Sequence, residues 1–162
     1  MLGKLDSKIA DNKVDEAIAI VEELGSKKIV EAVHLLIHHV LTTKNAKLRN
    51  SIAIALADIG SNEAIEPLIS LLKNPNTIGA RGTILYALES FPCTEYIELF
   101  AELLGEDSFE VSRQAFILID SHSENISSET KEKCISIIQK KIDRITDQKE
   151  FLIDSLEELG WE

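Results

Sequence analysis

The sequence has few of the residues that build loop-rich, disulfide-stabilised or disordered proteins. It contains only 3 prolines and 7 glycines in 162 residues, which disfavours a loop-rich β fold, and its 44% hydrophobic content argues against disorder. Aromatic residues make up only 5%, so a core must consist mainly of Ile, Leu, Val and Ala. The two cysteines, Cys93 and Cys134, have no metal-binding or redox spacing, and we interpret them as free buried thiols. The length suits one domain over residues 1–162.

Membrane, targeting and enzyme signals are also missing. No apolar run approaches the length of a membrane span, and the first residues lack the apolar segment of a secretory signal. There is no P-loop, no GxGxxG and no nucleophile elbow, and the abundant carboxylates fall on helix faces where solvent keeps them ionised. We therefore expect a cytoplasmic protein that is not an enzyme and needs no cofactor.

Basic residues are scarce in the middle of the chain. The formal net charge is −11, and residues 50–130 hold 13 acidic side chains against only 3 basic ones, Lys73, Arg81 and Arg113. Such a segment repels the phosphate backbone of nucleic acids, which proteins bind with Lys and Arg. It suits a basic protein partner instead. We expect no nucleic acid, no membrane and no small molecule as the ligand.

The sequence does contain an internal repeat of 32 residues. Residues 48–74 align with residues 80–106, so that Arg49 falls on Arg81 and the apolar positions coincide. A further shift of 32 reaches Arg113, and a looser copy covers residues 14–37. A repeat of this length is typical of a solenoid, in which stacked units bury one another's apolar faces.

Each repeat contains two helices, because apolar residues recur at helical spacing on both sides of a turn. Gly25, Gly60 and Gly105 follow apolar segments and are expected to take the left-handed conformation that ends a helix. Pro67 is expected early in its helix. Three acid-containing pairs are predicted as helix N-caps with an acid in the first turn: Asn12 with Asp15, Asp107 with Glu110, and Asp147 with Glu150.

The pattern Arg49, Ala55-Leu56, Gly60 and AIEPLISLL (64–72) resembles the HEAT-repeat family, and especially the short HEAT-like repeats of phycobilin lyase subunits. The resemblance implies an all-α fold, a right-handed α–α superhelix with the second helix of each repeat on its concave face, and binding rather than catalysis. We expect four repeats, over residues 13–43, 45–74, 77–106 and 108–143. A capping helix is expected over residues 147–159, with Trp161 folding back onto Leu156.

The second helix of the third repeat, TEYIELFAELLGE (94–106), is acidic at nearly every polar position. Its carboxylates recur every three or four residues, so they form one stripe on a helix. If such helices line the concave face, the acids of the preceding repeat lie beside this stripe. The predicted partner-binding residues are Glu63, Glu66, Glu95, Glu98, Glu102, Glu106, Asp107 and Glu110. The alternative is a solvated face that keeps the protein soluble.

Two further groups have a functional and a structural interpretation. Glu31, His34 and His38 share one helical face, where two histidines four residues apart could bind zinc, but no second ligand cluster occurs, so no metal site is expected. This face could instead continue the binding surface. The repeated arginines could form a ladder of anion sites, but their periodicity favours a structural role at helix ends or in ion pairs.

Three functions remain open from the sequence. The preferred hypothesis is an inhibitor, such as a bacterial immunity protein, that neutralises a basic toxin such as a nuclease, because complementary charge speeds association. A scaffold or assembly subunit is the second hypothesis, and it should carry an apolar patch beside the acids. An enzyme or a DNA-binding HEAT-like protein is disfavoured because the expected binding face is acidic.

Overall fold

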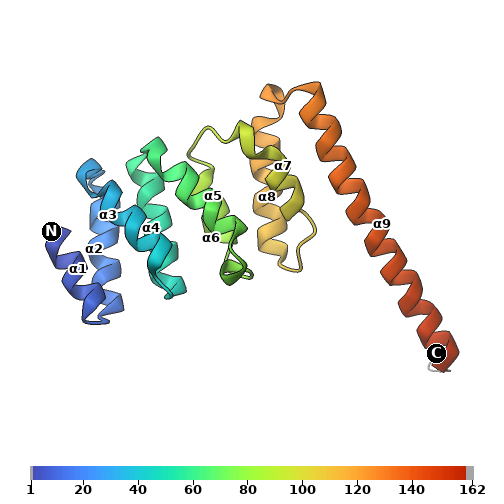
Figure 1. The fold of residues 1–162 in the computed structure, drawn as a ribbon, viewed down its shortest axis with the longest axis horizontal. Helices are drawn as coiled ribbons and strands as arrows, with labels where there is room; N and C mark the ends of the chain where they lie inside the picture. The colour runs from blue at the N-terminus through green and yellow to red at the C-terminus, as the bar shows by residue number, and fades with distance from the viewer. Residues whose placement is uncertain (1, 160–162) are drawn as a thin grey trace. The chain divides into compact units, whose positions relative to one another are not determined.

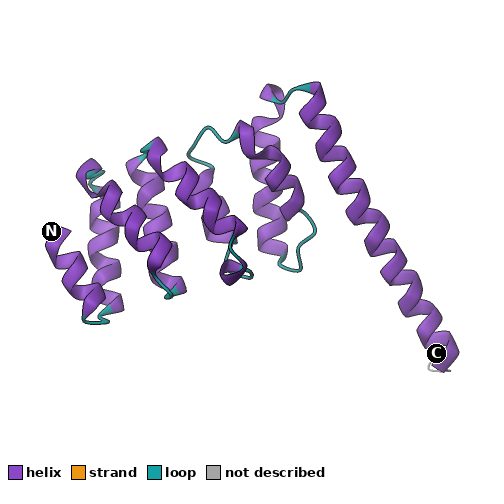
Figure 2. Ribbon diagram, in the orientation of Figure 1, coloured by secondary structure: helices purple, strands orange, loops and turns teal. Residues whose placement is uncertain are grey.

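The computed structural model describes residues 2–159, which form α-helices, short 3-10 helices and connecting loops, with no strand in that range (Figures 1 and 2). The all-α prediction is therefore confirmed. The α-helices are α1 Leu2–Ala10, α2 Val14–Ser26, α3 Val33–Thr42, α4 Ala46–Ile59, α5 Ile65–Lys73, α6 Gly82–Leu88, α7 Ile97–Leu103, α8 Phe109–His122 and α9 Ser128–Leu159. The 3-10 helices are η1 Val30–Ala32, η2 Asn62–Ala64, η3 Pro75–Thr77, η4 Thr94–Tyr96 and η5 Ser123–Asn125.

The chain divides into two compact units, Met1–Cys93 and Thr94–Glu162. In the first unit, α4 packs between α2 and α6, and α3 packs on α5. First helices thus stack on first helices and second helices on second helices, as in a HEAT-like solenoid. The hairpins α2–α3 and α4–α5 lie within the ranges expected for the first two repeats. An additional helix that the sequence analysis did not anticipate, α1, packs on α2 and buries Leu5 completely.

The core of the first unit is aliphatic because each helix presents its apolar residues at helical spacing. Ile52 and Leu56 of α4 are fully buried, as are Leu68 of α5 and Ile84 of α6. Each such side chain stabilises the fold by about 1.5–3 kcal/mol relative to an exposed one. No single hairpin could bury these faces alone, so the first unit depends on contact between neighbouring repeats.

Two of the three glycine predictions are confirmed. Gly60 has φ +78° and ends α4, and its N–H donates to the carbonyl of Leu56. Gly105 is also left-handed, with φ +76°. The prediction for Gly25 is wrong, because Gly25 lies inside α2, where a Cβ atom would be 2.8 Å from the Cα of Ala55. Gly25 therefore permits the close approach of α2 and α4, and Lys28 takes the left-handed position instead, with φ +51°.

The three predicted N-caps are wrong. Asn12 is left-handed with φ +55° and precedes the actual capping position, Asp107 is one residue too early, and Asp147 lies inside α9. A cap requires an extended backbone just before the helix. Asn45 meets this condition and accepts a hydrogen bond from the N–H of Leu48 at 3.0 Å. Ser108 meets it before α8.

Pro67 is the third residue of α5, as expected, where its missing N–H leaves no helical hydrogen bond unmade.

In the second unit, α7 packs against both α8 and α9. Its core is small: Phe100 and Ile97 of α7 are fully buried, together with Ala115 and Leu118 of α8. The second unit thus has fewer apolar side chains to hold it together than the first.

The separate capping helix expected over residues 147–159 does not exist, because α9 runs without a break from Ser128 to Leu159. No Gly or Pro occurs in this range to end a helix. The expected contact of Trp161 with Leu156 lies outside the described residues.

Candidate partner-binding surface

The predicted acids of the first unit lie at the start of the second helix of the α4–α5 hairpin. Glu63 belongs to η2 and Glu66 to the first turn of α5, and both are exposed. The Nε2 atom of His34 on α3 is 3.1 Å from the carboxylate of Glu63. The exposed face of α3 therefore meets the acidic end of the next hairpin. The interpretation that the helical face of His34 continues the binding surface stays a prediction.

The predicted acids of the second unit do not lie on one helix. Only Glu98 and Glu102 belong to α7, because this helix ends at Leu103. Glu95 lies in η4, and Glu106 follows the helix. The stripe expected over residues 94–106 is therefore a series of carboxylates on a 3-10 turn, a short helix and a loop.

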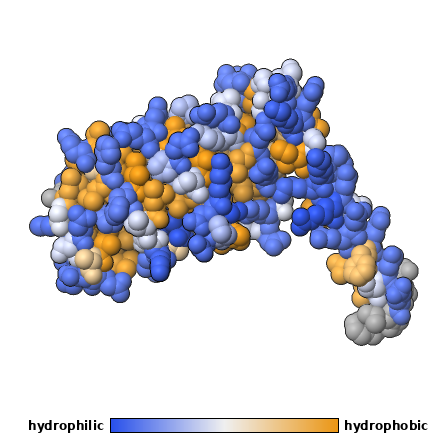
Figure 3. Space-filling view, viewed as in Figure 1, coloured by the Kyte–Doolittle hydropathy of each residue, from blue (hydrophilic) through white to orange (hydrophobic). Residues whose placement is uncertain are grey.

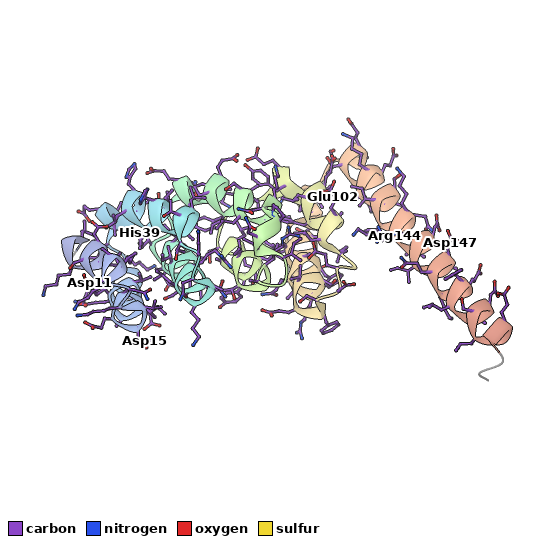
Figure 4. The ribbon with its side chains drawn as sticks, turned by 60° about the horizontal axis from the view of Figure 1, so that its bottom comes forward. Asp11, Asp15, His39, Glu102, Arg144 and Asp147 are labelled. Atoms are coloured by element: carbon purple, nitrogen blue, oxygen red, sulfur yellow. The ribbon has the colours of Figure 1, made fainter. Side chains whose placement is uncertain are left out.

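The exposure of these acids differs from one to the next. Glu95, Glu102 (Figure 4) and Glu110 are exposed. Glu106 is half-buried and interacts with neighbouring groups, and Glu66 of the first unit is likewise engaged. Asp107 is exposed in the loop before α8, where it borders a small cavity with Lys141 and Arg144 of α9.

Glu98 is turned toward α9 and contributes least to a free acidic face. Its carboxylate is 3.5 Å from the Nζ atom of Lys133, which is also 3.0 Å from the carboxylate of Glu129. The hydrogen bond to Glu129 and the negative charges of both acids raise the pKa of Lys133 above its usual value. Lys133 was not among the predicted residues, although a lysine four residues after a glutamate on a helix indicates an ion pair.

A second contact that the sequence pattern did not indicate joins a histidine of α3 to a carboxylate of α1. His39 of α3 is 9% exposed, and its Nε2 atom is 2.7 Å from the carboxylate of Asp6 on α1. The two residues are separated by 33 positions in the chain, so no local pattern links them. This contact is structural because it joins two helices through a buried histidine side chain.

The repeated arginines do not form a uniform ladder. Arg81 is 8% exposed and donates to the carbonyl of Asn74 at 3.3 Å and to the Thr77 hydroxyl at 3.5 Å, which fits the structural interpretation. Arg49 is also buried, whereas Arg113 is exposed on α8. The third copy of the repeat has therefore lost the buried arginine.

Metal-binding groups and cysteines were the remaining candidates for chemistry among the described residues. Within this range, no three His, Cys, Asp or Glu side chains gather into a group that could hold a metal ion. Cys93 and Cys134 are buried and free of disulfide bonds, as predicted. Burial, and to a smaller extent the charge of Glu98, raises the pKa of the Cys134 thiol, which makes it a weak nucleophile at neutral pH.

No helix among residues 2–159 combines the length and apolar composition needed to cross a lipid bilayer. The described helices carry charged groups on their surfaces, and such groups suit the recognition of another macromolecule.

Comparison with known proteins agrees with the fold. The family profile of HEAT repeats matches residues 7–89, which covers α2 to α6 and about half of the chain. No curated protein matches the chain significantly, so the likeness to phycobilin lyase subunits stays a prediction. HEAT repeats are generally non-enzymatic and serve protein–protein interaction or scaffolding. By its helical hairpins and by this match, the chain belongs to the HEAT repeats family.

Proposed function

We propose that this protein is a non-enzymatic protein-binding module that recognises a basic protein through its exposed carboxylates. The observation that carries the proposal is that Glu95, Glu102 and Glu110 of the second unit are exposed and have no ion-pair partner among the described residues. Carboxylates without a cation nearby repel one another, and a basic partner would relieve this repulsion. In the first unit, Glu63 and Glu66 are exposed acids as well.

Within this class we propose an inhibitor that neutralises its partner, such as an immunity protein bound to a basic nuclease toxin. The net charge of −11 supports this role, because complementary charge can raise association rates to about 10⁸–10⁹ M⁻¹s⁻¹ at low salt. The two free buried cysteines support a reducing compartment such as the cytoplasm.

The proposal is tested by capturing partners from a lysate of the native source with the tagged chain, at low and at high salt. We expect one stoichiometric basic protein whose binding weakens as salt increases. The purified pair is then titrated calorimetrically with the variant Glu95→Lys/Glu102→Lys, which should reduce affinity by at least about 100-fold, since like charges would face each other. Glu98 is left intact because it pairs with Lys133.

A control variant, Asp11→Lys/Asp15→Lys, makes the same change in net charge at exposed positions of the first unit (Figure 4). It should leave affinity within about threefold of the original, the residual effect being long-range and screened by salt. Equal losses in both variants would mean that only net charge matters. Unchanged binding in Glu95→Lys/Glu102→Lys would mean that these acids form a solvated face and do not contact the partner. An inhibitor should also suppress the activity of its captured partner in a purified assay.

An exposed apolar face on α9 favours a second candidate, a scaffold or assembly subunit. Ile142, Ile145, Leu152 and Leu156 are exposed, and their spacing of three, seven and four residues places them on one side of the helix. The C-terminal half of α9 extends beyond α7 and α8, and apolar side chains gather on it (Figures 1 and 3). Exposed apolar surface of this kind marks a contact site for other proteins.

The two candidates are distinguished by a change on α9. Leu152→Glu/Leu156→Glu should abolish capture by a scaffold and leave capture by an acidic inhibitor surface intact. Several proteins of one assembly, bound independently of salt and lost in this variant, would establish the scaffold in place of the inhibitor.

A further inference from the structure

Arg49 of α4 is a buried cation without a partner. Its side chain is only 7% exposed, and its Nε–H has no hydrogen-bond acceptor within the described part of the chain. No carboxylate there forms an ion pair with it either. A buried charge that is neither paired nor hydrogen-bonded is strongly disfavoured. The site therefore favours an anion that completes it.

The corresponding residue of the next repeat shows what is missing. Arg81 donates to Asn74 and Thr77 in the loop before its own helix. A shift of 32 residues places Asn45 where Thr77 lies, but the side-chain oxygen of Asn45 already accepts a hydrogen bond from the N–H of Leu48 as the N-cap of α4. Arg49, by contrast, forms no hydrogen bond with Asn45 or with the carbonyl of Thr42, the counterpart of Asn74, within the described part of the chain.

Arg49 lines a cavity of about 560 Å³ within the first unit. The cavity lies between the end of α3 with its following loop, which includes Lys44, and the segment after α5, which includes Asn76 of η3. Lys44 and Arg49 are its charged residues, and no carboxylate lines it. In a chain with a net charge of −11, this cavity is a local site of positive charge.

Arg49 is not needed to cap the neighbouring helices. At the end of α3, the N–H of Thr43 donates to the carbonyl of His39, and the Thr42 hydroxyl donates to the carbonyl of His38. At the end of α5, the hydroxyl of Thr77 and the N–H of Asn74 donate to the carbonyl of Leu71. The guanidinium is therefore available to a ligand.

We propose that this cavity is a binding site for a small oxyanion, a carboxylate or phosphate group held by Arg49 and Lys44. A planar guanidinium donates two parallel hydrogen bonds to such a group. Lys44 is exposed and reaches the same cavity as a second cation, and the side-chain amide of Asn76 adds a neutral donor. The volume is large enough for a small metabolite that carries the oxyanion. The site does not depend on the acidic surface or on the function proposed for it.

The experiment is an NMR titration of the full chain with inorganic phosphate and, separately, with succinate, at constant ionic strength set with sodium chloride. We expect saturable shifts of the Arg49 Nε–H signal and of the backbone amides of Lys44 and Asn76. Saturation by phosphate alone identifies a phosphate ligand, and saturation by succinate alone identifies a carboxylate ligand. Saturation by both anions shows that the site recognises the oxyanion chemistry that the two share.

Two variants connect the shifts to the site. Arg49→Lys keeps the charge but loses the planar pair of donors, so the dissociation constant should rise about tenfold or more. Lys44→Gln changes an exposed residue without threatening the fold and should raise the constant about threefold. Lys47→Gln is the matched control, since Lys47 is exposed on α4 and does not line the cavity, and it should leave the constant unchanged.

Three results would overturn the proposal: no saturation with either anion, shifts spread over the whole surface, or equal effects of Lys44→Gln and Lys47→Gln. The last comparison holds even if Arg49→Lys fails to fold, because both lysine variants change only exposed side chains.

Discussion

The first and second units are built from the same kind of helices, but they are stabilised to different extents. In the first unit, α4 is covered by α2, α3 and α6, so its apolar residues have neighbours on several sides. In the second unit, α7 packs against α8 and α9, whereas much of α9 has no neighbour within the unit. The comparison shows that a helical repeat gains its stability from the repeats beside it and less from its own composition.

The same comparison explains where function can reside. The first unit uses most of its apolar residues internally and keeps a buried arginine at the junction of two hairpins. The second unit leaves carboxylates and apolar side chains exposed, which are available to a partner. The following changes test this difference, beginning with the largest expected effect.

The largest effect should come from removing the central aromatic ring of the second unit. Phe100→Ala should lower the free energy of unfolding of this unit by about 3–5 kcal/mol, since the ring is fully buried in a small core. Hydrogen exchange monitored by mass spectrometry should show lost protection in α7 and α8 and retained protection in α2 to α5. The matched change Ile52→Ala should do the reverse. Equal loss of protection throughout the chain would show that the two units unfold together.

A smaller loss of stability is expected from adding a methyl group to the contact between α2 and α4. Gly25→Ala should destabilise the first unit by about 1–3 kcal/mol, because the new methyl group would lie 2.8 Å from the backbone of Ala55. Gly3→Ala is the control: no heavy atom lies within 4 Å of its added Cβ, and it should be neutral or stabilising by up to about 1 kcal/mol. Urea unfolding of both variants gives the difference, and a neutral Gly25→Ala would mean that the two helices can move apart freely.

The cap of α8 offers a matched pair of neighbouring residues. Ser108→Ala should cost about 1 kcal/mol, because the Ser108 hydroxyl accepts the N–H of Val111. Asp107→Ala should stay within about 0.5 kcal/mol, since Asp107 is exposed and does not cap the helix. Thermal unfolding measures both. A larger loss of stability in Asp107→Ala than in Ser108→Ala would mean that Asp107 is the cap of α8.

The smallest effect concerns reactivity and leaves stability unchanged. Burial raises the pKa of Cys134, so less thiolate is present at pH 8 than in an unfolded chain, and alkylation by iodoacetamide should be at least about tenfold slower. The rate should continue to rise at pH values where an ordinary thiol is already ionised. A rate equal to that in urea would mean that α9 separates readily from α7.

Much of the fold could be predicted from local pattern. The 32-residue shift between Arg49 and Arg81 identified the repeat, and the apolar spacing around Ile52 identified its helices. The turn at Gly60 was predicted because a left-handed residue favours glycine. The length of α9 was not predicted. The caps were not predicted either, since several polar residues near each helix start could serve as the cap, and the backbone geometry selects one of them.

The candidate surface was predicted only in its residue types. Nothing in the spacing of Glu98 shows that Lys133 of α9 lies beside it, because 35 residues separate the two in the chain. The pair Asp6 and His39 and the cavity at Arg49 likewise join segments that are distant in sequence.

The amino-acid sequence alone was sufficient for the helical repeat, its family and its negative charge, because these properties depend on periodicity and composition. Only the packed structure decided which acids are exposed, which glycine marks a close helix contact and which arginine is left without a partner. Those outcomes depend on distances between residues far apart in the chain, and such distances arise only when the hairpins stack.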